Sequence, residues 1–178
     1  MKKYIITALI SCSVFIILCS VGVDKMFILR QSTKGVLVYV MEQKMNCLKT
    51  GNKVKSIKYD YTYLQNPDSV TFLSTILLPS SQSPVSITFK NENIDYTEPV
   101  DLIFVKSKGK NFQYRLQIKL PYSLWKELYS NSSPFTIRYT FASEGAEVFY
   151  DFGYKEKKWQ ENREKINHII NIINLNTQ

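Results

Sequence analysis

Apolar and polar residues alternate along several segments of the chain, a period of two that is typical of β-strands with one buried face. The clearest segment is Phe112–Leu120, in which every second residue is apolar and Gln113, Arg115 and Lys119 stand among the polar residues between them. Three shorter segments repeat the pattern: Ile57–Tyr63, Val85–Phe89 and Phe135–Phe141. All four segments are predicted to be strands that bury their apolar side.

Four other segments are apolar at almost every position, which predicts strands that are covered from both sides. They are Val36–Met41, Val70–Leu78, Leu102–Val105 and Val148–Phe152. Residues that favour turns separate these segments, and one group of them is Lys108, Gly109 and Lys110. Residues 106–111 are therefore predicted to form a hairpin.

About eight strands joined by short turns, at spacings of roughly 10 to 15 residues, indicate an antiparallel fold rather than a βαβ fold. We predict a mainly β protein: an antiparallel β-sandwich with a short inserted helix and a long C-terminal helix. A lipocalin-like barrel is the alternative. The Gly-x-Trp sequence expected near the N-terminus of a lipocalin is absent, and a helix near Trp125 would interrupt an up-and-down barrel.

The inserted helix is predicted over Ser123–Tyr129, two residues after Pro121, with Ser123 as its N-terminal cap. Its apolar residues Leu124, Trp125 and Leu128 lie on one side. We expect this short helix to close one end of the strand assembly.

The C-terminal helix is predicted over about residues 156–174, where apolar residues recur at helical spacing. Its polar side includes Glu161 and Lys165, which are four residues apart and can pair. The apolar stripe has two interpretations: it covers the sheet, or it docks a partner subunit. The stripe consists of Trp159, Ile166, Ile169, Ile170 and Ile173.

Residues 1–23 form a separate segment, because Lys2 and Lys3 precede a run of about 20 residues without a charge. Such a segment is typical of a secretory signal peptide or an N-terminal membrane anchor. A lipoprotein signal ending at Cys12 is a third interpretation. In all three cases residues 24–178 are exported, so we expect a periplasmic or cell-surface protein of the cell envelope.

The orientation is not decided by charge, because Lys25, Arg30 and Lys34 follow the apolar run and balance the two lysines before it. A cytoplasmic domain tethered by its N-terminus therefore remains an alternative. Residues 24–178 are about 155 in number, which suits one domain with its own hydrophobic core.

The whole chain has 23 Lys and Arg against 15 Asp and Glu, a net charge of +8, which fits an anionic neighbour or simply solubility. Cys47 is the single cysteine of residues 24–178. No disulfide framework is predicted there, so burial of apolar surface must stabilise the domain.

Candidate chemistry is sparse. The only histidine, His168, lies in the predicted C-terminal helix, and no nucleophile motif accompanies it. One histidine and one exported cysteine cannot supply the usual zinc ligands. The six glycines are scattered and form neither a phosphate loop nor a dinucleotide fingerprint, so we predict no cofactor.

The acidic residues Glu92, Asp95, Glu98 and Asp101 are three residues apart and could converge on a hard cation. They lack the spacing of an EF-hand, and a solvated connection is the simpler interpretation. Paired carboxylates could also hydrolyse a glycoside, because sequence spacing does not report their distance in space.

Two ligand surfaces are predicted. Tyr59, Tyr61 and Tyr63 alternate on one strand face, which would stack a sugar or an apolar ligand if exposed and would be core if buried. Lys108 and Lys110 flank the hairpin turn and could contact an anion.

A nucleic acid is an unlikely partner, because Phe112 and Tyr114 share the apolar face of their strand and should be buried rather than free to stack on bases. The function predicted from the sequence is a non-catalytic binding or assembly protein of the cell envelope. A carrier barrel for a small apolar ligand and a carboxylate-dependent hydrolase are the alternatives.

Overall fold

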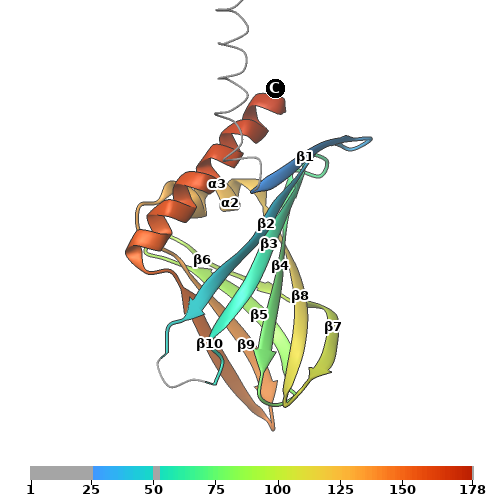
Figure 1. The fold of residues 1–178 in the computed structure, drawn as a ribbon, viewed down its shortest axis with the longest axis vertical. Helices are drawn as coiled ribbons and strands as arrows, with labels where there is room; N and C mark the ends of the chain where they lie inside the picture. Colours follow the sequence, from blue (N-terminus) through green and yellow to red (C-terminus); the bar gives the residue numbers. More distant parts are fainter. Residues whose placement is uncertain (1–25, 50–52, 178) are drawn as a thin grey trace, which may run out of the picture.

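The computed structural model describes residues 26–49 and 53–177 of the chain, which form one curled antiparallel sheet and two helices (Figure 1). The predicted leader, residues 1–23, lies outside the described residues. The strands are β1 (Phe27–Ser32), β2 (Gly35–Cys47), β3 (Ser56–Leu64), β4 (Ser69–Leu78), β5 (Ser83–Lys90), β6 (Asp95–Pro99), β7 (Asp101–Lys108), β8 (Asn111–Pro121), β9 (Thr136–Ser143) and β10 (Ala146–Gly153). The helices are α2 (Tyr122–Ser130) and α3 (Glu156–Asn176).

The sheet is almost closed into a barrel. Its strand order is β6-β5-β9-β10-β2-β3-β4-β8-β7, and β1 pairs with the first half of β2. The two edge strands, β6 and β7, are separated in the chain by Val100 alone. The Val100 amide donates to the Val85 carbonyl oxygen of β5 at 3.2 Å, which holds this joint against the neighbouring strand.

The mainly β, antiparallel fold with a short inserted helix and a long C-terminal helix is confirmed, and the curled single sheet corresponds to the barrel alternative. The alternation is confirmed in β8, where Tyr114, Leu116, Ile118 and Leu120 face inward and are buried. Residues 26–49 and 53–177 contain ten strands rather than about eight. The additional strands are β1 and β6, and β6 lies in the acidic segment that we interpreted as a connection.

The prediction that four apolar segments are covered from both sides was wrong. On β2, β4 and β10 the outward residues Tyr39, Met41, Leu77 and Phe149 are 38% to 48% exposed, and Val85 of β5, expected to be buried, is 41% exposed. Leu102–Val105 was expected to be covered from both sides, but all eight residues of β7 are exposed. An apolar run indicates that a residue could be buried, whereas side chains stand perpendicular to the sheet and are buried only where other residues pack on that face. β7 is an edge strand whose single strand partner in the described sheet is β8, and neither of its faces is covered.

Both helices lie across one end of the barrel (Figure 1). In α2, Trp125 and Leu128 are buried as expected. Pro121 occupies the N-cap position and no side chain caps the helix, so the prediction of Ser123 as the cap was wrong. The five stripe residues of α3 are buried within the chain itself, and α3 packs against α2 and β2. The described chain therefore uses this stripe for its own core.

Aromatic rings join the helices to the interior of the barrel. The Trp125 ring lies 5.4 Å from the Tyr61 ring of β3 and 6.0 Å from the Tyr129 ring, measured between centroids. The Trp159 ring of α3 stacks on Tyr129 at 5.5 Å and meets Phe135 edge-on at 5.3 Å. These distances are within the range of favourable ring pairs, so the helices and the sheet share one core.

Two pairs of tyrosine hydroxyls in the core bond to each other. The Tyr61 and Tyr129 hydroxyls are 3.1 Å apart, and the Tyr59 hydroxyl is bonded to that of Tyr154. Loss of solvent is the main reason that the pKa of Tyr59, Tyr61 and Tyr129 lies well above the ordinary value of 10.0. Burial likewise raises the pKa of Tyr154 to about 12. These side chains are neutral in the folded protein.

We predict that Trp125→Ala lowers the free energy of unfolding by about 3 to 5 kcal/mol, because it empties the contact between α2 and the barrel. Ser123→Ala is the matched control on the same helix. Since Ser123 is exposed and makes no cap, it should change stability by less than about 0.5 kcal/mol. Urea unfolding followed by circular dichroism measures both values. A loss of about 1 kcal/mol for Ser123→Ala would show that Ser123 does cap the helix.

We also predict that the protein loses stability as the pH rises above about 10. The unfolded chain ionises its tyrosines near that pH, whereas the folded chain keeps the buried ones protonated, so each such tyrosine lowers the unfolding free energy by up to about 1.4 kcal/mol per pH unit. Ultraviolet tyrosinate absorbance should therefore rise together with the loss of near-ultraviolet circular dichroism. Complete ionisation of a still-folded protein would contradict this assignment.

Candidate functional site

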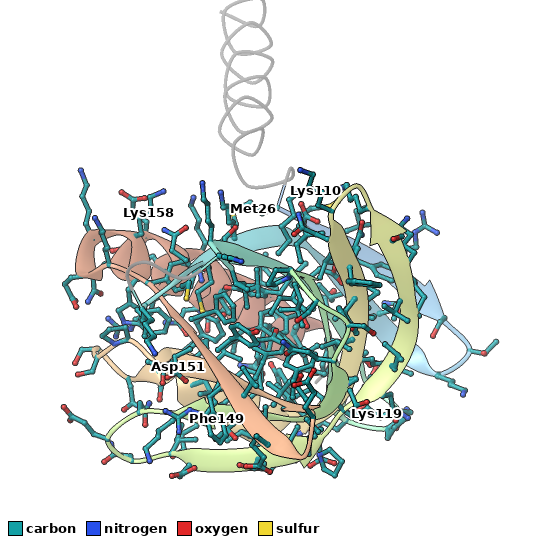
Figure 2. All side chains as sticks on the ribbon, turned by 90° about the horizontal axis from the view of Figure 1, so that it is seen from below. Met26, Lys110, Lys119, Phe149, Asp151 and Lys158 are labelled. Atoms are coloured by element: carbon teal, nitrogen blue, oxygen red, sulfur yellow. The ribbon has the colours of Figure 1, made fainter. Side chains whose placement is uncertain are left out.

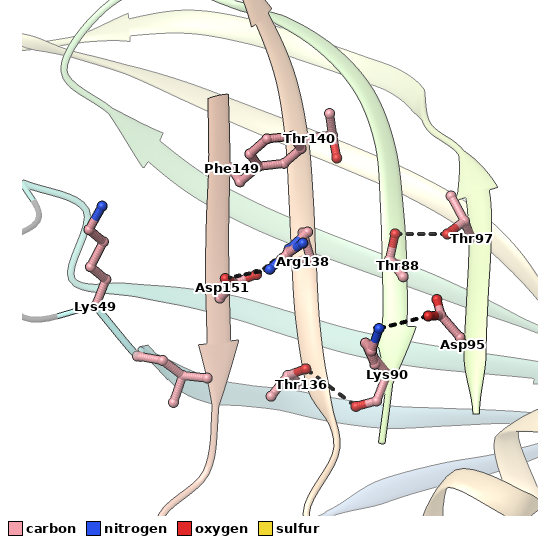
Figure 3. Close-up of a pocket in the computed structure, with 11 residues that line it drawn as sticks. Lys49, Thr88, Lys90, Asp95, Thr97, Thr136, Arg138, Thr140, Phe149 and Asp151 are labelled. Carbon is pink, nitrogen blue, oxygen red and sulfur yellow. Dashed lines mark hydrogen bonds and ion pairs between the residues drawn. The ribbon is translucent and has the colours of Figure 1, made fainter. Parts of the chain in front are cut away.

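A groove of about 690 Å³ crosses the outer face of β6, β5, β9 and β10 (Figure 3). The inward residues of these strands, such as Phe89 and Ile137, are buried in the core. Strand side chains alternate in direction, so the residues between them point outward. This is why Thr88, Thr136 and Arg138 line the groove.

Strand pairing arranges the groove residues in rows. Thr97 pairs with Thr88, Thr88 with Arg138, and Arg138 with Asp151, so four neighbouring strands each contribute one side chain to the first row. Paired residues of an antiparallel sheet lie about 4.5 to 5.5 Å apart. The groove floor is therefore a nearly continuous strip of hydroxyl, guanidinium and carboxylate groups.

Beside this row, Asp95, Lys90 and Thr136 form a second row in the same register. The Lys90 ammonium donates to the Asp95 carboxylate at 2.8 Å, and the Thr136 hydroxyl donates to the Lys90 carbonyl oxygen at 3.3 Å. Both rows are drawn with their hydrogen bonds in Figure 3.

The side chains of the first row hold one another in place. The Thr88 and Thr97 hydroxyls are 2.8 Å apart, and the Arg138 guanidinium donates to both Asp151 oxygens at 2.7 and 3.1 Å. The hydrogen bonds to Asp151 and the negative charge of Asp151 raise the pKa of Arg138 above its ordinary value. Such a two-point contact fixes the plane of the guanidinium.

One side of the groove is apolar. Phe149 of β10 and Leu48, just after β2, are 48% and 50% exposed. The Arg138 guanidinium carbon lies 5.4 Å from the centre of the Phe149 ring, which supports that ring from one side. The Leu48 amide donates to the Asp151 carbonyl oxygen at 2.9 Å.

Gly153 has no side chain, and Leu48 occupies the space that a side chain there would fill. A Cβ atom at Gly153 would lie 2.9 Å from the Leu48 Cδ2 atom, closer than such atoms approach in proteins. Glycine at this position therefore lets Leu48 lie against β10 at the side of the groove.

The three tyrosines predicted to form a ligand surface lie inside the barrel. Tyr59, Tyr61 and Tyr63 are 0%, 1% and 2% exposed on the inner face of β3. They are therefore core residues and not an exposed surface on which a ligand could stack.

Lys108 and Lys110 are exposed at the hairpin turn between β7 and β8, where Gly109 has a positive φ of 61°. They do not line the groove. Figure 2 places the Lys110 label well apart from those of Phe149 and Asp151. An anion contact at this turn stays a prediction.

The acidic residues of the segment 92–101 do not converge, and two of them bind different partners. Asp95 binds Lys90 in the groove, whereas the Glu98 carboxylate accepts a hydrogen bond from the Tyr96 hydroxyl at 2.7 Å. Burial and this carboxylate together raise the pKa of Tyr96 to about 12. Among the residues that the structure describes, no three acidic, histidine or cysteine side chains gather as a metal site. His168 is exposed on α3.

Most of the groove residues were not predicted from the sequence. The alternation did place Thr88, Thr136, Arg138 and Thr140 on the solvent side of their strands. The missing information was that β5 and β9, about 50 residues apart in the chain, are neighbours. Phe149 could not be recognised either, because it lies in Val148–Phe152, which was predicted to be covered from both sides.

Comparison with known proteins finds no matching family model, no matching curated protein and no matching solved structure. Within residues 26–49 and 53–177, neither helix combines the length and the hydropathy needed to cross a bilayer.

We predict that the groove tolerates mutation without unfolding. Arg138 and Asp151 are 51% and 35% exposed, so Asp151→Asn should cost less than about 1 kcal/mol. The matched contrast is Asp60→Asn, which removes the partner of the more buried Arg115 at 2.6 Å and should cost more. Urea unfolding gives both values, and the reverse order would contradict this reading.

Proposed function

We propose that this protein is a non-catalytic binding protein of the cell envelope that holds an extended, hydroxyl-rich ligand, a glycan chain, in the groove across β6, β5, β9 and β10. The observation that carries the proposal is the row of Thr97, Thr88, Arg138 and Asp151 beside exposed Phe149. It combines polar recognition groups with one apolar platform on the outer face of the sheet.

The chemistry of a sugar ring matches this combination. Sugar hydroxyls both donate and accept hydrogen bonds, as do the threonines, while Arg138 supplies donors and Asp151 supplies acceptors. The C–H face of a sugar ring is apolar and can cover Phe149. An open groove across four strands also suits a chain that enters and leaves at its two ends.

The groove groups are already oriented before a ligand arrives. Arg138 is fixed by two hydrogen bonds to Asp151, and Thr88 is bonded to Thr97. Pre-orientation reduces the ordering entropy that binding would otherwise cost. The envelope location in this proposal rests on the sequence of residues 1–23, which is typical of an exported chain.

The alternative of a small-ligand carrier has less support. Such a barrel needs an interior cavity, yet interior rings pack against one another, as at Tyr59–Phe72 and Phe72–Phe89 with centroids 5.5 and 5.3 Å apart.

A glycoside hydrolase is the second candidate, because Asp95 and Asp151 line the same groove. A glycosidase uses one carboxyl group as a protonated acid, usually kept so by burial or by another carboxylate. Here each carboxylate is bonded to a basic side chain on an open face, Asp95 to Lys90 and Asp151 to Arg138. This arrangement favours binding over hydrolysis.

The test is affinity electrophoresis of the full-length protein, in mild detergent, through gels that contain soluble xylan, dextran, mixed-linkage β-glucan or alginate. We expect at least one polysaccharide to retard the protein, and Phe149→Ala to weaken that binding at least about tenfold through loss of the apolar platform. Leu77→Ala is the control, since Leu77 is similarly exposed on β4, outside the groove.

Equal loss in both variants, or no retardation in any gel, would contradict the proposal. Reducing-end assays on the same polysaccharides separate the two candidate functions. If the protein releases reducing sugar and either Asp95→Asn or Asp151→Asn abolishes that release, the protein is a hydrolase rather than a binding protein.

A further inference from the structure

The free edge of β7 is an exposed apolar strand. Leu102, Ile103, Phe104 and Val105 are 45%, 51%, 39% and 45% exposed, and β7 has β8 as its single strand partner in the described sheet. Figure 1 shows β7 at the side of the barrel, away from the two helices. An exposed apolar edge is a template for pairing with another strand.

The residues of β7 divide clearly between the two faces of the sheet. Asp101, Phe104, Lys106 and Lys108 pair with outward residues of β8, whereas Leu102, Val105 and Ser107 pair with its inward residues. Ile103 is an extra residue, because the register shifts between Leu102 and Phe104. β7 therefore contains a bulge at Ile103.

The sequence of β7 is complementary to itself when two copies run antiparallel. The acidic residue, Asp101, is at the start of the strand, and the basic residues, Lys106 and Lys108, are near its end. Antiparallel pairing brings the acidic start of each strand to the basic end of the other. This favours opposite charges at both ends of a pair.

A symmetric register also places inward residues opposite inward residues and outward residues opposite outward residues. With Ile103 bulged in both copies, Asp101 lies opposite Lys108 of the second copy, and Leu102 lies opposite Ser107. In the centre, Phe104 lies opposite Lys106, and Val105 lies opposite itself on the two-fold axis. Every pair joins residues of the same face, which a bulge in one copy alone would not permit.

The centre of this register has a favourable contact that already exists within one chain. The Lys106 ammonium lies 5.2 Å from the centre of the Phe104 ring. In the symmetric pair, each Lys106 would also stand over Phe104 of the other copy, which is a cation–π arrangement.

From these observations we infer that β7 is a dimer interface, at which a second copy of this chain adds its own β7 in antiparallel orientation. The interface is isologous, since the same residues meet on both sides of the two-fold axis. It joins the two barrels through one continuous sheet. The inference does not depend on the ligand proposed for the groove.

The first test uses disulfide formation in the full-length chain, in a variant whose three native cysteines are serine. Val105→Cys should form a covalent dimer under mild oxidation, because the paired positions on the axis would be about 4.5 to 5.5 Å apart. Glu147→Cys, another exposed strand position, on β10, is the control and should stay monomeric.

A mixed experiment determines the register. Leu102→Cys and Ser107→Cys should each give little covalent dimer alone and a strong heterodimer when the two variants are mixed. A Val105→Cys yield no higher than the Glu147→Cys control would overturn the proposal, as would equal yields in the single and mixed samples.

Charge reversal tests the ends of the interface through sedimentation of the noncovalent dimer. Asp101→Lys and Lys108→Asp should each weaken dimerisation severalfold, and the double variant should restore it. Failure of the double variant to recover, with each single variant folded by circular dichroism, would contradict the paired charges. A monomeric wild-type protein at all concentrations would contradict the interface itself.

Discussion

The structure depends on the packing of aromatic rings inside one curled sheet. A sheet that bends round on itself must fill the space it encloses, and here bulky rings of β3, β4 and β9 occupy it. α2 and α3 complete the filling at one end, where Trp125, Tyr129 and Trp159 contact rings of the barrel or one another. The outward residues are thereby freed from any role in the core and can form a recognition surface.

Local pattern was sufficient wherever a strand had one covered face. In β8 the alternation predicted the strand and its inner face, because both follow from side-chain direction. The turn residues Lys108, Gly109 and Lys110 predicted its hairpin. Local pattern was insufficient for β7, since the sequence of Leu102–Val105 is the same whether or not other residues pack on the two faces of the strand. It also missed β6, whose polar residues Asp95, Thr97 and Glu98 resemble a loop.

The candidate site was beyond the reach of the sequence for a related reason. Its parts are ordinary outward residues, and only the pairing of β5 with β9 and of β9 with β10 turns them into rows. Thr88 and Arg138 are 50 positions apart, and no local signal specifies that they meet. The tyrosines of β3 are large and regularly spaced, which suits a ligand surface, yet those same properties make them good core residues.

The joint at Val100 places two surfaces on one stretch of chain, since Thr97 of β6 lines the groove and Asp101 of β7 begins the free edge. Two copies joined along β7 would hold their grooves at a set separation. A polymer long enough to reach both would then bind by avidity, because attachment at the first groove raises the effective concentration at the second. Short fragments of the same polymer would gain nothing from this geometry.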